Sequence, residues 1–284
     1  MPAIRLTTRR VEKPWGRRDL WPGFPDPAPG EGPIGEVWFE APADALGGAE
    51  PELLVKYLFT SEKLSIQDHP NDEEARKRGY PRGKDEAWVV LAAEPHATIG
   101  IGMIEPMTRE ELRAAALDGT IEDRLDWHGV KAGDVFYSPA GTVHAIGPGL
   151  VLVEVQQNVD LTYRLYDYGR PRELHLDDGI AVAEPVPYVA THVPEERSPG
   201  RLILADGPKF VLERWSAAGE GAFAIGERGP AWLIPLAGRG EIDGAPLEPG
   251  GVWLVEGEAR LRLDPDIDML VAYPGDQVVE GLWR

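Results

Sequence analysis

The sequence predicts a mainly β protein, built from short strands that close into a barrel or a sandwich. Glycine and proline are abundant, with 33 and 27 of the 284 residues, and they interrupt the chain at short intervals. Between them lie apolar or alternating runs of strand length, such as Leu53–Phe59 and Ala87–Ala93. Frequent turns between short strands are typical of all-β domains rather than of helical bundles.

The composition restricts the classes of partner and site. With 29 basic and 48 acidic residues, the chain carries a net charge of −19. We therefore expect neither nucleic acid nor an anionic membrane as a partner, because both attract positive protein surfaces. The chain has no cysteine, which excludes disulfides, thiolate metal sites and a cysteine nucleophile. It shows no signal peptide and no membrane-length apolar run, so we expect a cytoplasmic protein.

The first elements follow from local patterns in chain order. Residues 22–34 are rich in proline and glycine and predict an irregular loop. We expect strands over Gly35–Glu40, Leu53–Phe59 and Lys63–His69. A short helix follows, with Asn71 as its cap, an acidic first turn, a basic last turn and a stop at Gly79.

The next elements include a second helix and a long strand. Thr108 and Glu111 have capping-box spacing, so this helix begins at Thr108 and ends near Gly119. From Gly133 to Tyr166 the pattern is almost entirely strand and turn. The even positions from Glu154 to Arg164 are polar, whereas most odd positions are apolar. This alternation predicts one long strand with a core face and a polar face suited to a ligand-lined barrel mouth.

A proline-rich segment, Pro185–Pro199, predicts a domain boundary. We expect a first domain over 1–185 and a second, smaller β-barrel over 200–284. The stretch that begins at Gly133 and ends at His144 has a faint echo that begins at Gly250. If the echo is real, the protein holds two related barrels, and only the first keeps metal ligands.

The candidate functional residues lie at the ends of predicted strands. Gln67 and His69 are two residues apart, so their side chains share one strand face. Lys84 and Glu86 repeat this spacing, and His144 follows a tight turn. Taken singly, each has an ordinary structural interpretation, such as a turn histidine or a solvated charge pair. Taken together, they favour a divalent metal site with nitrogen and oxygen ligands inside a barrel.

Five segments carry a more specific pattern: Lys13–Gly16, Leu64–Asn71, Gly83–Glu86, Ser138–His144 and Glu154–Arg170. In order and spacing they resemble type I mannose-6-phosphate isomerase in its short bacterial form. The resemblance implies a cupin-type jelly-roll β-barrel with a few short helices and one zinc ion per chain. Beyond Arg170 it becomes faint, so the second barrel is expected to be a degenerate cupin-like one.

The resemblance also implies individual roles. It makes Gln67, His69, Glu86 and His144 the zinc ligands, which agrees with the set reached from spacing. It makes Arg164 the active-site arginine and Lys84 a candidate proton shuttle. The implied reaction interconverts mannose 6-phosphate and fructose 6-phosphate through an enediol. Further candidate substrate contacts are Lys56, Arg82, Asp160 and Arg170.

Two positions depart from the family pattern, and two other functions stay open. Val159 stands where a serine is usual, and Asp68 stands where an apolar residue is usual. The substrate is therefore less fixed by the sequence than the chemistry. One alternative is a non-catalytic sugar-binding or regulatory cupin with a structural metal. The other is an iron-dependent cupin oxygenase, although such sites favour more histidines. The sequence gives no indication of the oligomeric state.

Overall fold

The structure is a computed structural model that describes residues 3–21 and 23–284. Within these residues four α-helices accompany three antiparallel sheets, so the mainly β prediction is confirmed. The predicted loop over 22–34 is irregular from Gly23 to Pro33, while Pro22 lies outside the described residues. No helix in the described ranges is long and apolar enough to cross a membrane.

Two of the sheets face each other as a barrel, which is consistent with the expected cupin-type fold. The six-stranded sheet runs in the order β2 (Thr7–Arg17), β3 (Ile34–Glu40), β4 (Leu53–Phe59), β11 (Leu150–Gln157), β6 (Glu86–Ala93) and β9 (Val135–Ser138). The five-stranded sheet runs in the order β12 (Tyr163–Tyr166), β5 (Ile66–Asp68), β10 (His144–Ile146), β7 (Thr98–Met103) and β8 (Leu125–Gly129). Buried side chains from both sheets, including Trp88, Ile99 and Leu152, form one apolar cluster.

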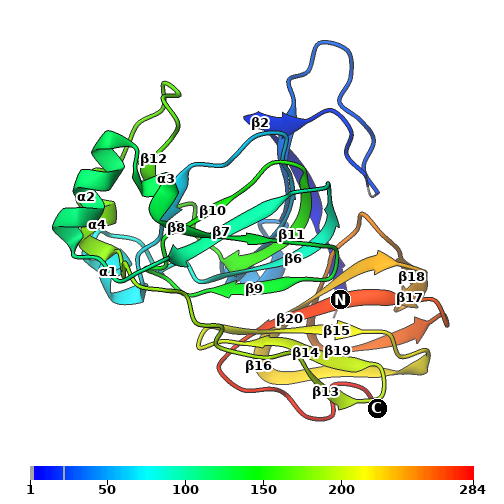
Figure 1. Ribbon diagram of the computed structural model, residues 1–284. Coiled ribbons are helices and arrows are strands. Elements are labelled where there is room, and N and C mark those ends of the chain that lie inside the picture. The colour runs from blue at the N-terminus through cyan, green and yellow to red at the C-terminus, as the bar shows by residue number, and fades with distance from the viewer. Residues whose placement is uncertain (1–2, 22) are drawn as a thin grey trace.

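The third sheet contains the C-terminal strands. Its members are β13 (Glu195–Ser198), β14 (Arg201–Asp206), β15 (Phe210–Trp215), β20 (Asp268–Pro274), β16 (Gly219–Ala237), β19 (Trp253–Leu263), β17 (Gly240–Ile242) and β18 (Ala245–Leu247), in spatial order. A ninth strand, β1 (Ala3–Arg5), pairs with β19, so the first described strand and the C-terminal residues lie beside this sheet (Figure 1). The division into domains 1–185 and 200–284 stays a prediction, and β1 is an exception to it.

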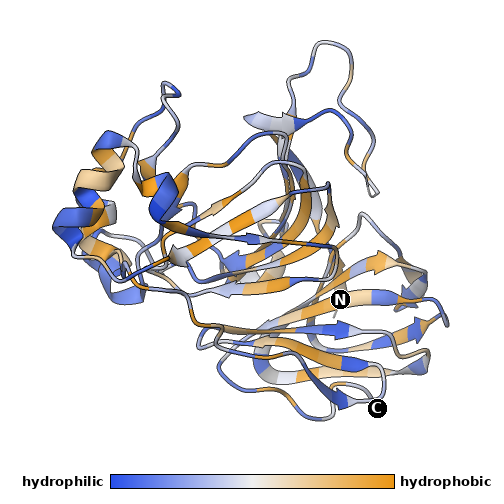
Figure 2. Ribbon diagram, viewed as in Figure 1, coloured by the Kyte–Doolittle hydropathy of each residue, from blue (hydrophilic) through white to orange (hydrophobic). Residues whose placement is uncertain are grey.

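The sheets and helices form successive layers. Valines of β11, including Val153 and Val155, pack in one cluster with Leu212 of β15 and Leu254 of β19. This cluster joins the six-stranded sheet to the C-terminal sheet. The helices are α1 (Asp72–Lys77), α2 (Arg109–Asp118), α3 (Ile121–Arg124) and α4 (Leu176–Val182). A second cluster joins the five-stranded sheet to three of the four helices, α2, α3 and α4. All four helices gather at the opposite end of the molecule (Figure 1). Figure 2 shows the corresponding apolar residues along the strands.

Both helix caps predicted from the sequence are confirmed. The Asn71 side chain accepts a hydrogen bond from the Glu74 amide at the start of α1. Thr108 and Glu111 make both bonds of a capping box at the start of α2. These bonds satisfy amide groups that have no partner within the helix. Gly119 ends α2 in the left-handed conformation, with φ of 85°.

Two of the predicted strands are shorter than expected. The strand predicted over Lys63–His69 is regular only in β5. The long strand predicted from Glu154 to Arg164 is wrong, because β11 ends at Gln157 and β12 begins at Tyr163. At the break, the Gln156 side chain donates to the carbonyls of Gln157 and Val159, which replaces ladder bonds by local ones.

The apolar cluster between the six-stranded sheet and the C-terminal sheet should contribute strongly to stability. Leu212 is fully buried in it, so Leu212→Ala should lower the free energy of unfolding by about 2–5 kcal/mol through lost burial and a cavity. Urea unfolding monitored by fluorescence measures this change. Leu117 is 67% exposed, and Leu117→Ala should change the same quantity by less than about 0.5 kcal/mol. Equal losses in the two variants would contradict this account of the core.

Candidate metal centre

The predicted ligands lie on facing strands at one end of the barrel. On the five-stranded sheet, Gln67 of β5 pairs with His144 of β10 on one side and with Arg164 of β12 on the other. His69 follows β5 two residues after Gln67, so strand alternation directs both side chains to the same face. On the six-stranded sheet, Glu86 is the first residue of β6.

Three of these side chains converge on one point. Nε2 of His144 lies 3.0 Å from Oε1 of Glu86, and Nε2 of His69 lies 3.3 Å from the same oxygen. Possible ligand atoms of the three residues all lie within 4.8 Å of one another, and all three side chains are buried. Gln67 completes the group, with its Nε2 3.3 Å from Nε2 of His144. A half-turn of this amide would bring its oxygen to the same position.

Backbone carbonyls fix which ring nitrogen of each histidine faces the cluster. Nδ1 of His69 lies 2.9 Å from the Leu161 carbonyl, and Nδ1 of His144 lies 2.9 Å from the Thr142 carbonyl. Each Nδ1 therefore carries the proton that it donates, and each Nε2 keeps its lone pair. Burial and the nearby charge of Lys84 lower the pKa of His69 to about 3, so this histidine is neutral at pH 7.

Glu86 faces these lone pairs as a carboxylate. Burial raises its pKa, but the positive charge of Lys84, together with the interactions with His69 and His144, outweighs this effect and holds the pKa well below its ordinary value. The ammonium group of Lys84 lies 3.3 Å from Oε2 of Glu86. Among the described residues, neither oxygen of Glu86 nor Nε2 of His69 has a hydrogen-bond partner. Such a buried group of lone pairs and negative charge is costly unless it is compensated by a cation.

The chemistry and the spacing of these donors fit zinc. Zinc takes histidine nitrogen and carboxylate oxygen ligands at roughly 2.0–2.2 Å, which places tetrahedral ligand atoms about 3.3–3.6 Å apart. The distances from Glu86 to the two histidines, 3.0 and 3.3 Å, are close to this separation. The second nitrogen of each histidine is already held by a carbonyl, as is usual for metal-binding histidines.

A cavity of about 420 Å³ opens beside the cluster. Its wall contains five of the residues predicted from the sequence: Lys56, Gln67, Lys84, Asp160 and Arg164. It also contains Glu154, which the sequence placed on the polar face of a ligand-lined barrel mouth. Five further charged, aromatic or histidine side chains were not expected at the site from the sequence: Lys13, Glu36, Trp38, Arg172 and His175. The site is therefore a cleft lined with alternating charges rather than a mainly apolar pocket.

One cross-strand row supplies two of the charged residues on the cavity wall. Lys56 of β4 pairs with Glu154 of β11, and their charged groups lie 3.1 Å apart. The indole of Trp88, the next residue in the row, donates to the other oxygen of Glu154 at 3.1 Å, and Lys56 lies over the ring of Trp38. Burial lowers the pKa of Lys56, but Glu154 and Glu36 outweigh this effect and raise it. Lys56 is therefore a fixed positive charge held by Glu154.

Two arginines lie at the other side of the cavity. Arg164 donates to the carbonyl of Glu173 at 2.9 Å, and Arg172 makes two hydrogen bonds of 2.6 Å to the carboxylate of Asp167. Burial and the charge of Arg172 lower the pKa of Arg164. The two guanidinium groups thus provide neighbouring positive charges on the wall of the cavity.

Two other predicted substrate contacts, Arg82 and Arg170, are not among the residues that line this cavity. Arg82 donates to the carbonyl of Asn158 at 2.9 Å. Arg170 donates to the carboxylate of Asp167 at 2.7 Å and to the carbonyl of Lys63 at 2.8 Å. Both guanidinium groups are therefore occupied by the protein itself.

Lys13 belongs to a segment that the sequence had already singled out, Lys13–Gly16. A Cβ atom at Gly16 would lie 2.5 Å from the backbone nitrogen of Gly35, so glycine is needed for the close approach of β2 to β3. This approach brings Lys13 within 3.2 Å of the Glu36 carboxylate. No sequence signal pointed to Arg172, because its role depends on the path of the loop after β12.

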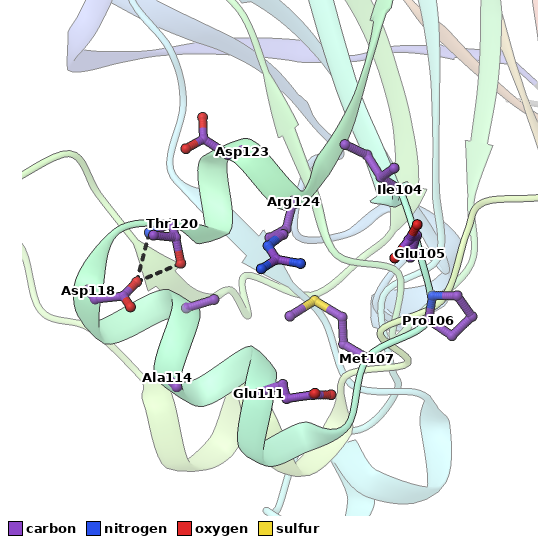
Figure 3. A pocket seen from close by; sticks show the side chains of 11 residues that line it. Ile104, Glu105, Pro106, Met107, Glu111, Ala114, Asp118, Thr120, Asp123 and Arg124 are labelled. Carbon is purple, nitrogen blue, oxygen red and sulfur yellow. Dashed lines mark hydrogen bonds between the residues drawn. The ribbon is translucent and has the colours of Figure 1, made fainter.

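A separate hollow of about 610 Å³ lies beside α2 and α3 (Figure 3). Arg124 and Met107 point into it, and Glu111 and Asp118 lie at its edge (Figure 3). The predicted ligands, all of which the structure describes, do not line this hollow. We therefore keep the functional assignment with the cavity beside the histidines.

No model of a known protein family matches the chain. The mannose-6-phosphate isomerase of Streptococcus mutans is 35% identical over 205 residues, and mannose-6-phosphate isomerase ManA of Bacillus subtilis is 37% identical over 208 residues. These alignments cover 67% and 69% of this chain, but 62% and 65% of the relatives. The chain thus spans slightly less than two thirds of the length of the curated relatives that it matches.

Solved structures extend the likeness to nearly the whole chain. The mannose 6-phosphate isomerase of Bacillus subtilis has a TM-score of 0.80 at 27% identity, over 96% of this chain and 100% of that one. A zinc-bound mannose 6-phosphate isomerase has a TM-score of 0.72 at 15% identity, over 97% of this chain and 100% of that one, a likeness of fold alone. On the combined evidence of sequence and fold, the chain belongs to the mannose-6-phosphate isomerase family.

Proposed function

We propose that the protein is a zinc-dependent aldose–ketose isomerase that interconverts mannose 6-phosphate and fructose 6-phosphate. The observation that carries the proposal is the buried group of possible metal donors, His69, Glu86 and His144. This group lies beside a cavity whose wall includes Gln67, Lys84 and Arg164. The identity of the sugar phosphate comes from the relatives, which are named for this substrate.

We assign the metal ligands to Gln67, His69, Glu86 and His144, with one zinc ion per chain. The absence of cysteine from the chain limits the donors to nitrogen and oxygen, and this set suits zinc in redox-free chemistry. A zinc-bound neighbour of the same fold gives further support.

The reaction moves a proton between C1 and C2 of the sugar through an enediol. Bound zinc supplies Lewis-acid polarisation of the sugar carbonyl. Arg164 keeps its positive charge and stabilises negative charge that develops on the sugar oxygens. Lys84 lies on the cavity wall beside Glu86 and is the candidate that moves the proton.

An anionic substrate must overcome the charge of −19 on the chain. Arg164 and Arg172 form a local positive patch on the cavity wall, and we assign the phosphate group to this side. Lys56, whose charge is held by Glu154 at 3.1 Å, serves instead to orient that carboxylate toward the sugar. Asp160, exposed at the cavity wall, is a candidate partner for a sugar hydroxyl.

The proposal also covers how the chain is divided into units and in which cellular compartment the protein works. We propose that residues 1–185 form the catalytic unit and that residues 200–284 form a second unit without metal ligands. A cytoplasmic location fits an enzyme of phosphorylated sugars whose chain has no cysteine.

Loss of one imidazole should remove both the metal and the activity. His144→Ala should release zinc during dialysis and abolish the interconversion, because the cluster loses a ligand. Metal analysis and a coupled assay with mannose 6-phosphate measure the two effects. His128 lies away from the cluster, 3.3 Å from Asp126, and His128→Ala should leave both unchanged. Full zinc content in His144→Ala would contradict the ligand assignment, and turnover by the zinc-free wild-type protein would contradict the mechanism.

Arg164 should act on catalysis more than on folding. Arg164→Ala should lower kcat roughly 10²–10³-fold, because the variant loses a charge that stabilises the transition state. Steady-state kinetics give kcat, and the thermal unfolding midpoint should stay close to that of the wild type. A kcat within tenfold of the wild type would refute this role. A zinc-loaded wild-type protein that binds the sugar but does not convert it would favour the binding-protein alternative.

The phosphate assignment distinguishes two arginines on one loop. Arg172→Ala should raise KM for mannose 6-phosphate roughly 10–100-fold, because it removes a hydrogen bond to a charged group. Arg170→Ala is a matched control, since Arg170 also binds Asp167 but does not line the cavity. Its KM should stay within about threefold of the wild type. The reverse order of the two KM values would overturn the assignment.

A further inference from the structure

Residues 83–86 have two faces with different surroundings. Lys84 and Glu86 point toward the metal cluster and the cavity, as the ion pair between them indicates. Because side chains alternate along extended backbone, the side chain of Asp85 points the other way, toward Tyr137. That other face is held by groups that lead to the C-terminal half of the chain.

The first connection passes through Asp72. Its Oδ1 accepts hydrogen bonds from the amide of Gly83 at 2.8 Å and from the side chain of Gln157 at 3.1 Å. Its Oδ2 accepts a hydrogen bond of 2.8 Å from the ammonium group of Lys209. Burial raises the pKa of Asp72, but these bonds outweigh it and lower the pKa to about 2, so the carboxylate is charged at pH 7. Gln157 extends the connection, since it exchanges two hydrogen bonds with the backbone of Asp85.

The second connection passes through Tyr137. Its hydroxyl donates to Oδ2 of Asp85 at 2.8 Å, and the other oxygen of Asp85 accepts from the Ala140 amide. The ring of Tyr137 packs against Phe210 with 5.2 Å between ring centroids. A Cβ atom at Gly207 would lie 2.1 Å from this ring, so only glycine allows the chain to approach so closely.

Both connections end in the same turn of the C-terminal sheet. Gly207 and Lys209 lie between β14 and β15, and Phe210 is the first residue of β15. We propose that Lys209 is a positioning residue for the metal centre: through Asp72 it holds the backbone at Gly83, and thereby fixes where Lys84 and Glu86 present their side chains. This inference rests on the proposed function, and it gives the C-terminal half a part in the active site although it contributes no ligand.

The proposal can be tested on the full-length protein with Lys209→Met. This variant keeps the apolar stem and removes the charge, so it should weaken zinc binding and lower kcat, each roughly tenfold, the low end of the effect of groups that support metal ligands. KM for mannose 6-phosphate should change by less than about twofold, because Lys209 does not line the cavity. With cobalt in place of zinc, the visible absorption spectrum should shift.

Two further variants separate positioning from ordinary stabilisation. Lys209→Arg keeps the charge and should restore zinc affinity and kcat. Arg214→Met removes the Arg214–Asp268 ion pair, whose side chains are 37% and 25% exposed, against 31% and 21% for Lys209 and Asp72. It should lower the unfolding midpoint about as much as Lys209→Met, with unchanged zinc affinity and kcat.

The outcomes distinguish this proposal from the proposed function. Wild-type zinc affinity and kcat in Lys209→Met, or equal losses in Arg214→Met, would overturn the role of Lys209. A wild-type protein that binds zinc without isomerase activity would refute the proposed function, while the comparison of zinc affinities would still test Lys209.

Discussion

Mutual repulsion among three buried donors is the constraint on which the rest of the structure depends. Nε2 of His69 and of His144 present lone pairs, and Glu86 presents a negative charge, and all three side chains are buried. Groups of this kind are stable together only around a cation. The backbone carbonyls that hold the two Nδ1 atoms keep the histidines from relieving the repulsion by turning away.

His144 and Glu86 are the first residues of their strands, and His69 lies directly after the end of β5, so strand register and alternation position these donors. Gln67 lies directly between His144 and Arg164 in the five-stranded sheet, so one strand row carries two of the proposed ligands and Arg164. In the facing sheet, the row through Lys56 and Glu154 places fixed charges opposite them. Because one face of the six-stranded sheet packs on the C-terminal strands, its other face is free to line the cavity.

Much of this arrangement could be predicted from the sequence, because it depends on local rules. The spacing of two residues correctly predicted that Gln67 and His69 share one face. The capping residues Thr108 and Gly119 correctly predicted both ends of α2. The break between Gln157 and Tyr163 could not be predicted, because it depends on which hydrogen bonds the buried Gln156 side chain makes. Polar and apolar residues alternate in the sequence in the same way whether the strand continues or the chain turns.

A second limit of prediction from the sequence concerns which arginine lines the cavity. Arg170 and Arg172 are two residues apart on one loop, and both bind Asp167. Composition cannot tell which one faces the cavity, since that depends on how the loop folds back between β12 and α4. The contact between Asp72 and Lys209 joins residues 137 positions apart, and no local pattern in the sequence indicates it.

Diffraction at the zinc absorption edge, from crystals of the zinc-loaded protein, tests the central claim most directly. The account predicts one anomalous peak per chain, roughly 2.0–2.2 Å from Nε2 of His69, Nε2 of His144 and a carboxylate oxygen of Glu86. A peak at another place, or the two imidazoles turned to opposite sides of the sheet with no peak between them, would contradict it.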